Sequence, residues 1–184
     1  MQIGPLDIPN EVLTALEENR LVIFAGAGVS IPPPANLPSF RNLVEEIVGK
    51  PLSPDEEGQM DRVLGRAKER EVPVHRLAAE RLSQSASHFN SLHENLVALF
   101  GSAAAVRIVT TNFDRHFEGA IEVRPGLSGV EIYTAPALPV GSSFTGLVHL
   151  HGVLSPTQLA SAREIPEARR APVSAEDREL SGRT

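Results

Sequence analysis

Residues 21–25 have the sequence LVIFA, and residues 26–30, which follow directly, have the sequence GAGVS. A short apolar run of β-branched and aromatic residues is typical of a strand buried on both faces, as in a parallel sheet. Glycines after such a strand let the backbone approach a diphosphate and aim its N–H groups at it. The dinucleotide fingerprint G-x-G-x-x-G is incomplete, because Ile31 stands at its last glycine position. A plain glycine turn is therefore an equal alternative.

Strand and helix patterns alternate along the rest of the chain. Further strands are expected at residues 106–110, 130–133 and 146–150, and flanking helices at residues 10–19 and 112–122. Residues 39–101 show only helical spacing of apolar residues. These patterns predict an α/β fold, with a Rossmann-like, mainly parallel sheet and a helical insert between strands one and two.

The insert carries its own helix signals. Ser39 is expected to cap a helix that ends near Gly49, and Ser53 and Glu56 form a capping box that opens a helix towards Arg70. A further helix is expected at residues 74–82.

Composition limits the classes of function. The chain has 184 residues, a formal net charge of −6 and no cysteine. The missing cysteines exclude disulfides, a cysteine nucleophile and thiolate zinc sites, and we expect no metal. An acidic chain without a basic block argues against direct nucleic-acid binding, and no apolar run approaches the roughly 20 residues of a membrane span.

The chain starts without the pattern of a secretion signal, so a cytoplasmic location is expected. Residues 1–158 are expected to form one α/β domain. Residues 159–184 are a charged segment with few large apolar side chains, either a disordered tail or a truncated remainder of the domain.

A second polar motif, TTNFD at residues 110–114, lies at the carboxyl end of the expected second strand. Ligands of open α/β sheets bind at that edge. Asn112 offers both a donor and an acceptor to a sugar hydroxyl or a water, and Asp114 can accept from a carboxamide. The alternative is that Thr111 or Asn112 merely caps the next helix.

A third motif, HLHG at residues 149–152, ends the fourth expected strand. His151 lies where a general base would be placed, and Gly152 leaves room for a substrate. The alternative is a pair of structural histidines. The other histidines lie on expected helices without metal-ligand neighbours: His75, His88, His93 and His116.

Taken together, the three motifs resemble the sirtuin superfamily, whose members share G-A-G-[IV]-S, [TQ]-[TQ]-N-x-D and H-G. Residues 37–41, LPSFR, resemble the family's G-I-P-x-F-R segment. Sirtuin deacylases carry a four-cysteine zinc module, which this chain lacks, and usually have Asp where Ser39 stands. The helical insert and the TTNFD sequence resemble the zinc-free sirtuin-like domains of bacterial anti-phage systems, which hydrolyse NAD. The strands and adenosine-side loop that follow H-G in the family are not visible after Gly152, so the domain looks C-terminally incomplete.

The resemblance implies that NAD is the substrate and that Asn112 and His151 are catalytic. It implies that NAD is bound by Ala25, Gly26, Ala27, Gly28, Ser30, Phe40, Arg41, Thr111, Phe113 and Asp114. The expected partners are a second copy of the chain, a sensor module or an Argonaute-like protein. Two alternatives stay open: a non-catalytic domain that binds NAD or ADP-ribose, and an NAD-dependent deacylase, which the missing zinc module disfavours.

Overall fold

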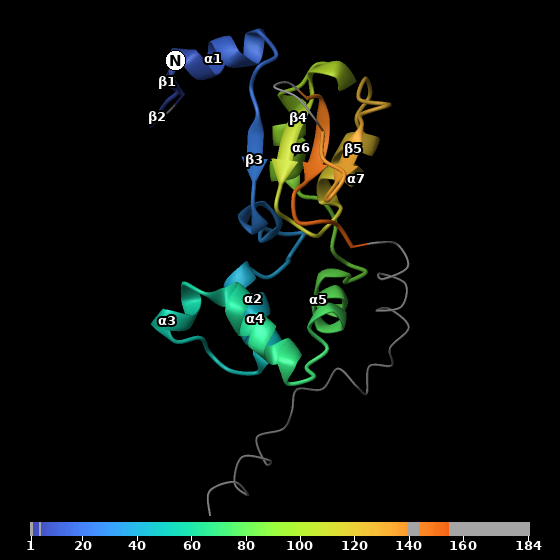
Figure 1. Ribbon diagram of the computed structural model, residues 1–184. Coiled ribbons are helices and arrows are strands. Elements are labelled where there is room, and N and C mark those ends of the chain that lie inside the picture. The colour runs from blue at the N-terminus through green and yellow to red at the C-terminus, as the bar shows by residue number, and fades with distance from the viewer. Residues whose placement is uncertain (1, 4, 140–143, 155–184) are drawn as a thin grey trace, which may run out of the picture.

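The computed structural model describes residues 2, 3, 5–139 and 144–154 (Figure 1). The tail expected at residues 159–184 and the domain boundary at residue 158 lie outside these residues. Within the described part, a small sheet with helices on one face is joined to a helical lobe beyond the ends of its strands.

The sheet has four parallel strands in the order β3-β4-β6-β5. Their bounds are Ile23–Ala25 for β3, Arg107–Thr110 for β4, Ile132–Thr134 for β5 and Gly146–His149 for β6. The register aligns the last residues of all four strands, so their carboxyl ends form one edge: Ala25, Thr110, His149 and Thr134. The parallel, Rossmann-like sheet confirms the fold class expected from the sequence.

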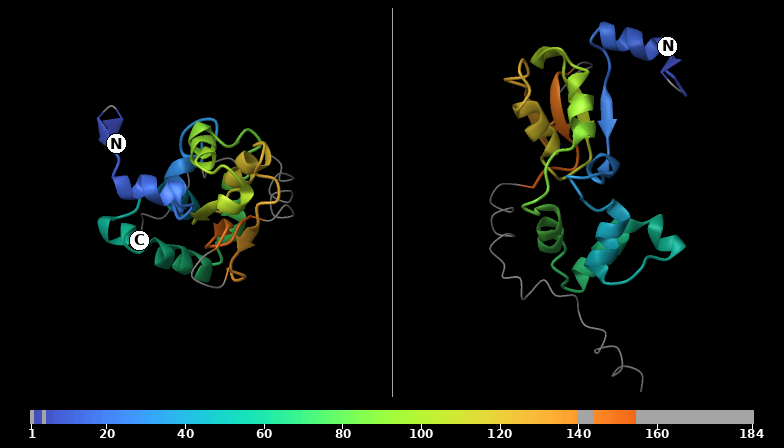
Figure 2. Two further views of the ribbon diagram at one scale, coloured as in Figure 1. Left: turned by 90° about the horizontal axis from the view of Figure 1, so that it is seen from above. Right: turned by 180° about the vertical axis from the view of Figure 1, so that it is seen from behind.

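Helices α6, Ser91–Ala98, and α7, His116–Glu122, cover one face of the sheet (Figure 2). The main core forms between them and the strands, with Val97 and Phe117 packed against Ile108 and Leu147. On the other face, Phe24 of the edge strand β3 is 67% exposed, whereas Val148 of the inner strand β6 is 3% exposed. The expectation that this strand is buried on both faces was wrong, because a continuous apolar run does not reveal whether both faces have a cover.

The helical insert connects β3 to β4 and lies beyond the carboxyl edge of the sheet (Figure 1). It comprises α2 at Phe40–Val48, α3 at Pro54–Glu57, α4 at Met60–Glu69 and α5 at Val74–Leu82. Ser39 caps α2 and Gly49 ends it in the left-handed conformation, as expected. The capping box of Ser53 and Glu56 is also present, but the chain breaks at Gly58 and Gln59 into two helices instead of one.

Other element boundaries differ from the sequence expectation. The hairpin of β1, Gln2–Ile3, and β2, Leu6–Asp7, was not expected, and α1, Asn10–Glu17, ends two residues before the expected end at residue 19. Helix α7 begins only at His116, so Asn112 lies in a loop and caps no helix. None of the helices in the described ranges is long and apolar enough to cross a bilayer.

Gly146 opens β6 with a φ of +124°, and a Cβ there would lie 2.3 Å from the carbonyl oxygen of Glu131. We predict that Gly146→Ala lowers the free energy of unfolding by at least about 2 kcal/mol, through steric overlap and a strained backbone. Urea titration followed by circular dichroism measures this loss. Gly28→Ala is the matched control, because its Cβ would meet no atom within 4 Å and its φ is ordinary. Equal unfolding midpoints for the two variants would contradict the prediction.

Candidate functional site

The hydroxyl of Ser30 connects the first two motifs at the carboxyl edge of the sheet. Ser30 ends the short 3-10 helix η1, Ala27–Ser30, which directly follows β3, and it is 1% exposed. Its Oγ donates to Oδ2 of Asp114 at 2.9 Å and accepts from Nδ2 of Asn112 at 3.1 Å. The backbone N–H of Thr111 also donates to the carbonyl of Ala25 at 3.1 Å. The GAGVS and TTNFD segments therefore form one hydrogen-bonded unit.

Two residues that the sequence analysis did not select belong to the same unit. Nε2 of the fully buried His93 lies 3.3 Å from Oγ of Ser30, and its Nδ1 lies 2.8 Å from Oδ1 of Asn90. Asn90 donates to the carbonyls of Val29 and Pro32, which fixes the backbone on both sides of Ser30. A signal was present in the sequence, because Asn90 caps α6 and His93 occupies the capping-box position three residues later.

Burial lowers the pKa of His93 to about 4 and outweighs the nearby Asp114, which raises it. His93 is therefore neutral at pH 7. Burial also lowers the pKa of His116, whose ring lies edge-on to that of His93 with 5.5 Å between centroids. The carboxylate of Asp114 thus lies in a polar cluster whose histidines carry no charge at neutral pH.

Both carboxylate oxygens of Asp114 accept hydrogen bonds from groups of this protein. Its Oδ2 accepts from Ser30, its Oδ1 accepts from the backbone N–H of His116 at 3.0 Å, and the residue is 8% exposed. Each carboxylate oxygen has the capacity to accept a further hydrogen bond. In this structure, however, Asp114 chiefly holds Ser30 and the start of α7 in place.

Asn112 has a different hydrogen-bonding state. Its Nδ2 is fixed by Ser30 and its backbone N–H donates to Oγ1 of Thr110 at 3.1 Å. Its Oδ1 is buried and has no hydrogen-bond partner among the described residues. A buried acceptor without a partner costs about 1–3 kcal/mol, so such groups are rare and call for an explanation such as a catalytic role or a bound water or ion.

The third motif joins the second at the same edge. Leu150 donates to the carbonyl of Thr110 at 2.9 Å, and Leu154 donates to the carbonyl of Phe113 at 3.0 Å. β6 ends at His149, so His151 lies in the following turn, where its exposed ring packs at 6.4 Å from the ring of Phe113. His151 is accessible to a ligand, whereas His149 is fully buried.

The glycines of the first motif are not required by the fold. Gly26 has an extended backbone, and a Cβ there would make only an ordinary 3.7 Å contact with Thr111. A Cβ on Gly28 would point into open space. Glycine at both positions is consistent with close approach of a ligand to the backbone.

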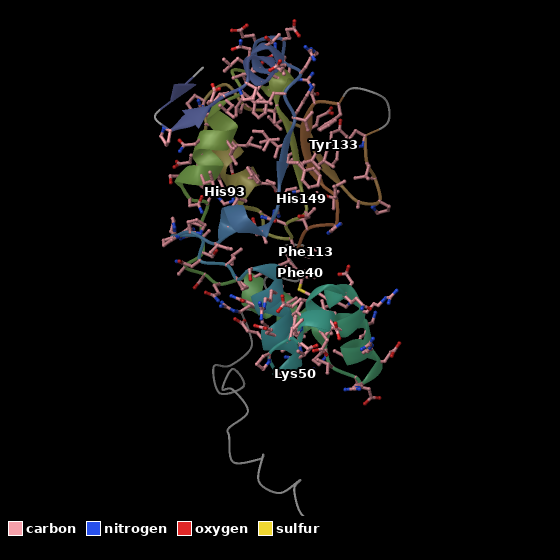
Figure 3. The ribbon with its side chains drawn as sticks, turned by 90° about the vertical axis from the view of Figure 1, so that its left-hand side faces the viewer. Phe40, Lys50, His93, Phe113, Tyr133 and His149 are labelled. Atoms are coloured by element: carbon pink, nitrogen blue, oxygen red, sulfur yellow. The ribbon has the colours of Figure 1, made fainter. Side chains whose placement is uncertain are left out.

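Phe40 and Arg41 are the first two residues of α2 in the helical lobe. Figure 3 shows Phe40 at the end of the lobe nearest to Phe113. Phe40 packs partly against the lobe's own apolar residues Leu52 and Val63. Arg41 pairs with Glu45 at 3.1 Å and with Glu57 at 3.0 Å, so its guanidinium is engaged within the lobe.

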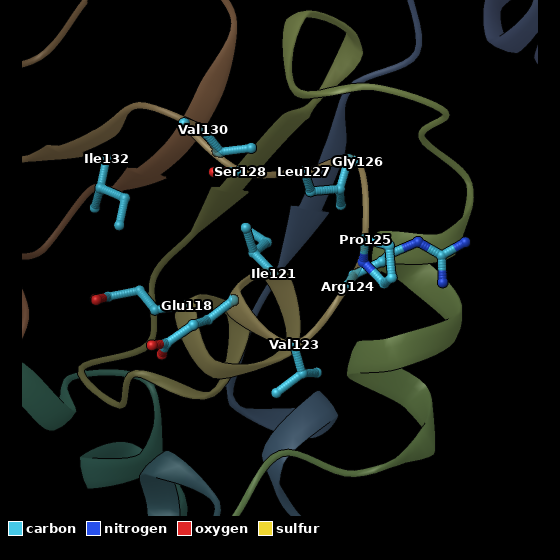
Figure 4. Close-up of a pocket in the computed structure, with 12 residues that line it drawn as sticks. Glu118, Ile121, Val123, Arg124, Pro125, Gly126, Leu127, Ser128, Val130 and Ile132 are labelled. Atoms are coloured by element: carbon cyan, nitrogen blue, oxygen red, sulfur yellow. The ribbon is translucent and has the colours of Figure 1, made fainter.

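A cavity of about 570 Å³ lies elsewhere (Figure 4). It borders the end of α7 and the connection from α7 to β5, with Ile121, Arg124, Leu127 and Val130 among its lining residues. Glu118, one of the lining residues, lies within ion-pair distance of His149 at the carboxyl edge. We place the candidate site at the motif edge and not in this cavity, because the cavity wall contains none of the motif residues.

The described residues contain no group of three or more histidine, aspartate or glutamate side chains that could hold a metal ion. The edge instead combines free backbone surface at a glycine loop, a fixed amide with an available acceptor, and an accessible imidazole. Such a set can bind a polar ligand with phosphates, orient a hydroxyl or a water, and accept a proton.

Comparison with known proteins adds one relative. The chain is 33% identical over 177 residues to the uncharacterized protein y4cA of Sinorhizobium fredii (strain NBRC 101917 / NGR234). The match covers 85% of this chain but only 14% of that protein. No family model matches the chain.

We predict that acidification destabilises the protein partly through His93. Its folded-state pKa of about 4 lies below the ordinary value of 6.5, so the unfolded chain binds a proton more readily. The free energy of unfolding should therefore fall as the pH drops from about 6.5 towards 4. Urea midpoints measured across this range should fall less steeply for His93→Gln than for the unchanged chain. A slope that the substitution leaves unaltered would contradict the assignment.

Proposed function

We propose that this protein is a zinc-independent, sirtuin-like NAD hydrolase, which cleaves the bond between nicotinamide and ribose to give nicotinamide and ADP-ribose. The observation that carries the proposal is the state of Asn112. Its amide nitrogen is fixed by Ser30, and its buried oxygen is without a partner at the edge where the three motifs meet. An oriented acceptor that the described residues leave unsatisfied is what a ribose hydroxyl or an attacking water requires.

The other groups fit the same reaction. The backbone around Gly26 and Gly28 is open to a diphosphate, and the accessible His151 lies beside the loop that holds Asn112. Water adds to C1′ of the ribose as the bond from C1′ to the nicotinamide nitrogen breaks. Nicotinamide leaves as a neutral molecule, so no strong acid is needed, and His151 accepts the proton that the water loses. The transition state should resemble an oxocarbenium ion, as in other glycosyl transfers.

The wider role rests on the resemblance alone. We propose a function in bacterial anti-phage defence by NAD depletion, in which the domain acts as a homo-oligomer or with a sensor or Argonaute-like partner. The chain spans 14% of the length of y4cA, so in that protein the matching region is one part of a much larger polypeptide.

We predict that the chain converts NAD to nicotinamide and ADP-ribose and that His151→Ala slows this turnover by about 10²–10⁴-fold, the usual contribution of a positioned base. Chromatographic product analysis, with circular dichroism to confirm folding, measures both. His75→Ala is the matched control, because His75 is an exposed histidine on α5, outside the motif edge. It should retain full activity.

Two results would contradict the proposal in different ways. Binding of NAD without turnover, equal in wild type and His151→Ala, would favour a non-catalytic NAD or ADP-ribose domain. Turnover that depends on an acetylated peptide, with formation of acetylated ADP-ribose, would indicate a deacylase.

A further inference from the structure

His149 lies next to the proposed site but takes no part in the mechanism described above. It is the last residue of β6, it is fully buried, and its side chain lies on the sheet face that α7 covers. Its Nδ1 lies 3.3 Å from the backbone carbonyl oxygen of Asn112. The ring therefore contacts the main chain of the residue whose side chain carries the proposed function.

The other side of the ring faces α7. Nε2 of His149 lies 3.4 Å from Oε1 of Glu118, within ion-pair distance but without the geometry of a hydrogen bond. Arg115, one turn earlier, donates through Nε to the other carboxylate oxygen of Glu118 at 2.9 Å. A continuous polar chain thus connects Arg115, Glu118 and His149 to Asn112.

The carboxylate is suited to hold the ring. Burial raises the pKa of Glu118, but His149 and Arg115 outweigh it, and the pKa lies below its ordinary value. Glu118 is therefore ionised at neutral pH. The carbonyl at Nδ1 and the anchored carboxylate at Nε2 are both acceptors, so an imidazolium ring, with an N–H on each nitrogen, satisfies both contacts and is restricted in its rotation.

We propose that Glu118 and His149 form a positioning pair, in which Glu118 orients the imidazole and the imidazole Nδ1–H holds the carbonyl of Asn112. The pair fixes the loop from β4 to α7, so that the Asn112 side chain meets Ser30 on one side and presents its oxygen to the ligand on the other. The role in catalysis rests on the proposed NAD hydrolysis. The contacts of His149 with Glu118 and with the carbonyl of Asn112 do not depend on that proposed reaction.

Two substitutions of His149 separate positioning from packing. The amide nitrogen of Asn lies near the place of histidine Nδ1, whereas that of Gln lies near the place of Nε2. His149→Asn therefore keeps the donor to Asn112, and His149→Gln keeps the contact with Glu118 and loses that donor. Gln is also the larger of the two and fills the space of the His149 ring better. If His149 served packing alone, His149→Gln would therefore retain more activity than His149→Asn.

We expect His149→Gln to lower kcat for NAD about 10- to 100-fold with little change in KM, since misplacement of an orienting group affects mainly the reacting geometry. His149→Asn should retain several-fold more activity than His149→Gln. Glu118→Gln should also lower kcat. Its matched control is Glu122→Gln, one turn further along α7, which removes a similar charge with no contact to His149 and should leave kcat unchanged.

A second readout does not depend on activity. The ¹³C chemical shift of the Asn112 carbonyl reports its hydrogen bond, and it should move upfield in His149→Gln and stay near the wild-type value in His149→Asn. Equal shifts in both folded variants would overturn the positioning pair, even if NAD hydrolysis is found. Loss of the carbonyl hydrogen bond only in His149→Gln, in a chain that hydrolyses no NAD, would support the pair and refute the proposed reaction.

Discussion

A single buried hydroxyl, Ser30 Oγ, determines the arrangement of the motif edge. It donates to Asp114 and accepts from Asn112, and His93 lies against it. A hydroxyl has one donor and two acceptor positions, so these three neighbours account for its full capacity. Because Ser30 follows β3 and its partners follow β4 or begin α6, this hydroxyl fixes elements that are separated by more than 60 residues. Alanine at this position would leave several buried polar groups without partners, each at a cost of about 1–3 kcal/mol.

The arrangement also explains why Asn112 differs from its neighbours. Asp114 and His93 have protein partners for their polar atoms, whereas the oxygen of Asn112 does not. The fold therefore fixes the amide nitrogen, while the buried oxygen has no hydrogen-bond partner among the described residues. This oxygen, the unobstructed glycine backbone and the accessible His151 are the features on which the proposed cleavage of a nucleotide's glycosidic bond rests.

Much of the fold was predictable from local pattern. The caps at Ser39 and Ser53, the helix at Val74–Leu82 and the order of strands and helices all depend on residues close together in sequence. The exposure of Phe24 was not predictable, because the cover of a sheet face comes from distant elements. The start of α7 was placed too early, since Asn112 bonds across to Ser30 instead of capping the helix.

The candidate site was predictable in its motifs but not in its supporting residues. Asn112, Asp114, Ser30 and His151 were selected as parts of short motifs, and the structure brings those motifs to one edge. His93, Asn90, Glu118 and His149 act through contacts between elements, and single histidines on helices carry no local signal of such contacts. The Asn90 to His93 spacing was the exception, because it forms a visible capping box.

The most direct test of the account is a titration of the ¹⁵N-labelled chain with NAD, followed by amide chemical shifts. We predict that the shifts concentrate in residues 25–30, 110–114 and 151–152, which would place one ligand across all three motifs. Shifts confined to the cavity near Ile121 and Leu127, or no shifts at millimolar NAD, would contradict the central claim that this edge is a nucleotide site.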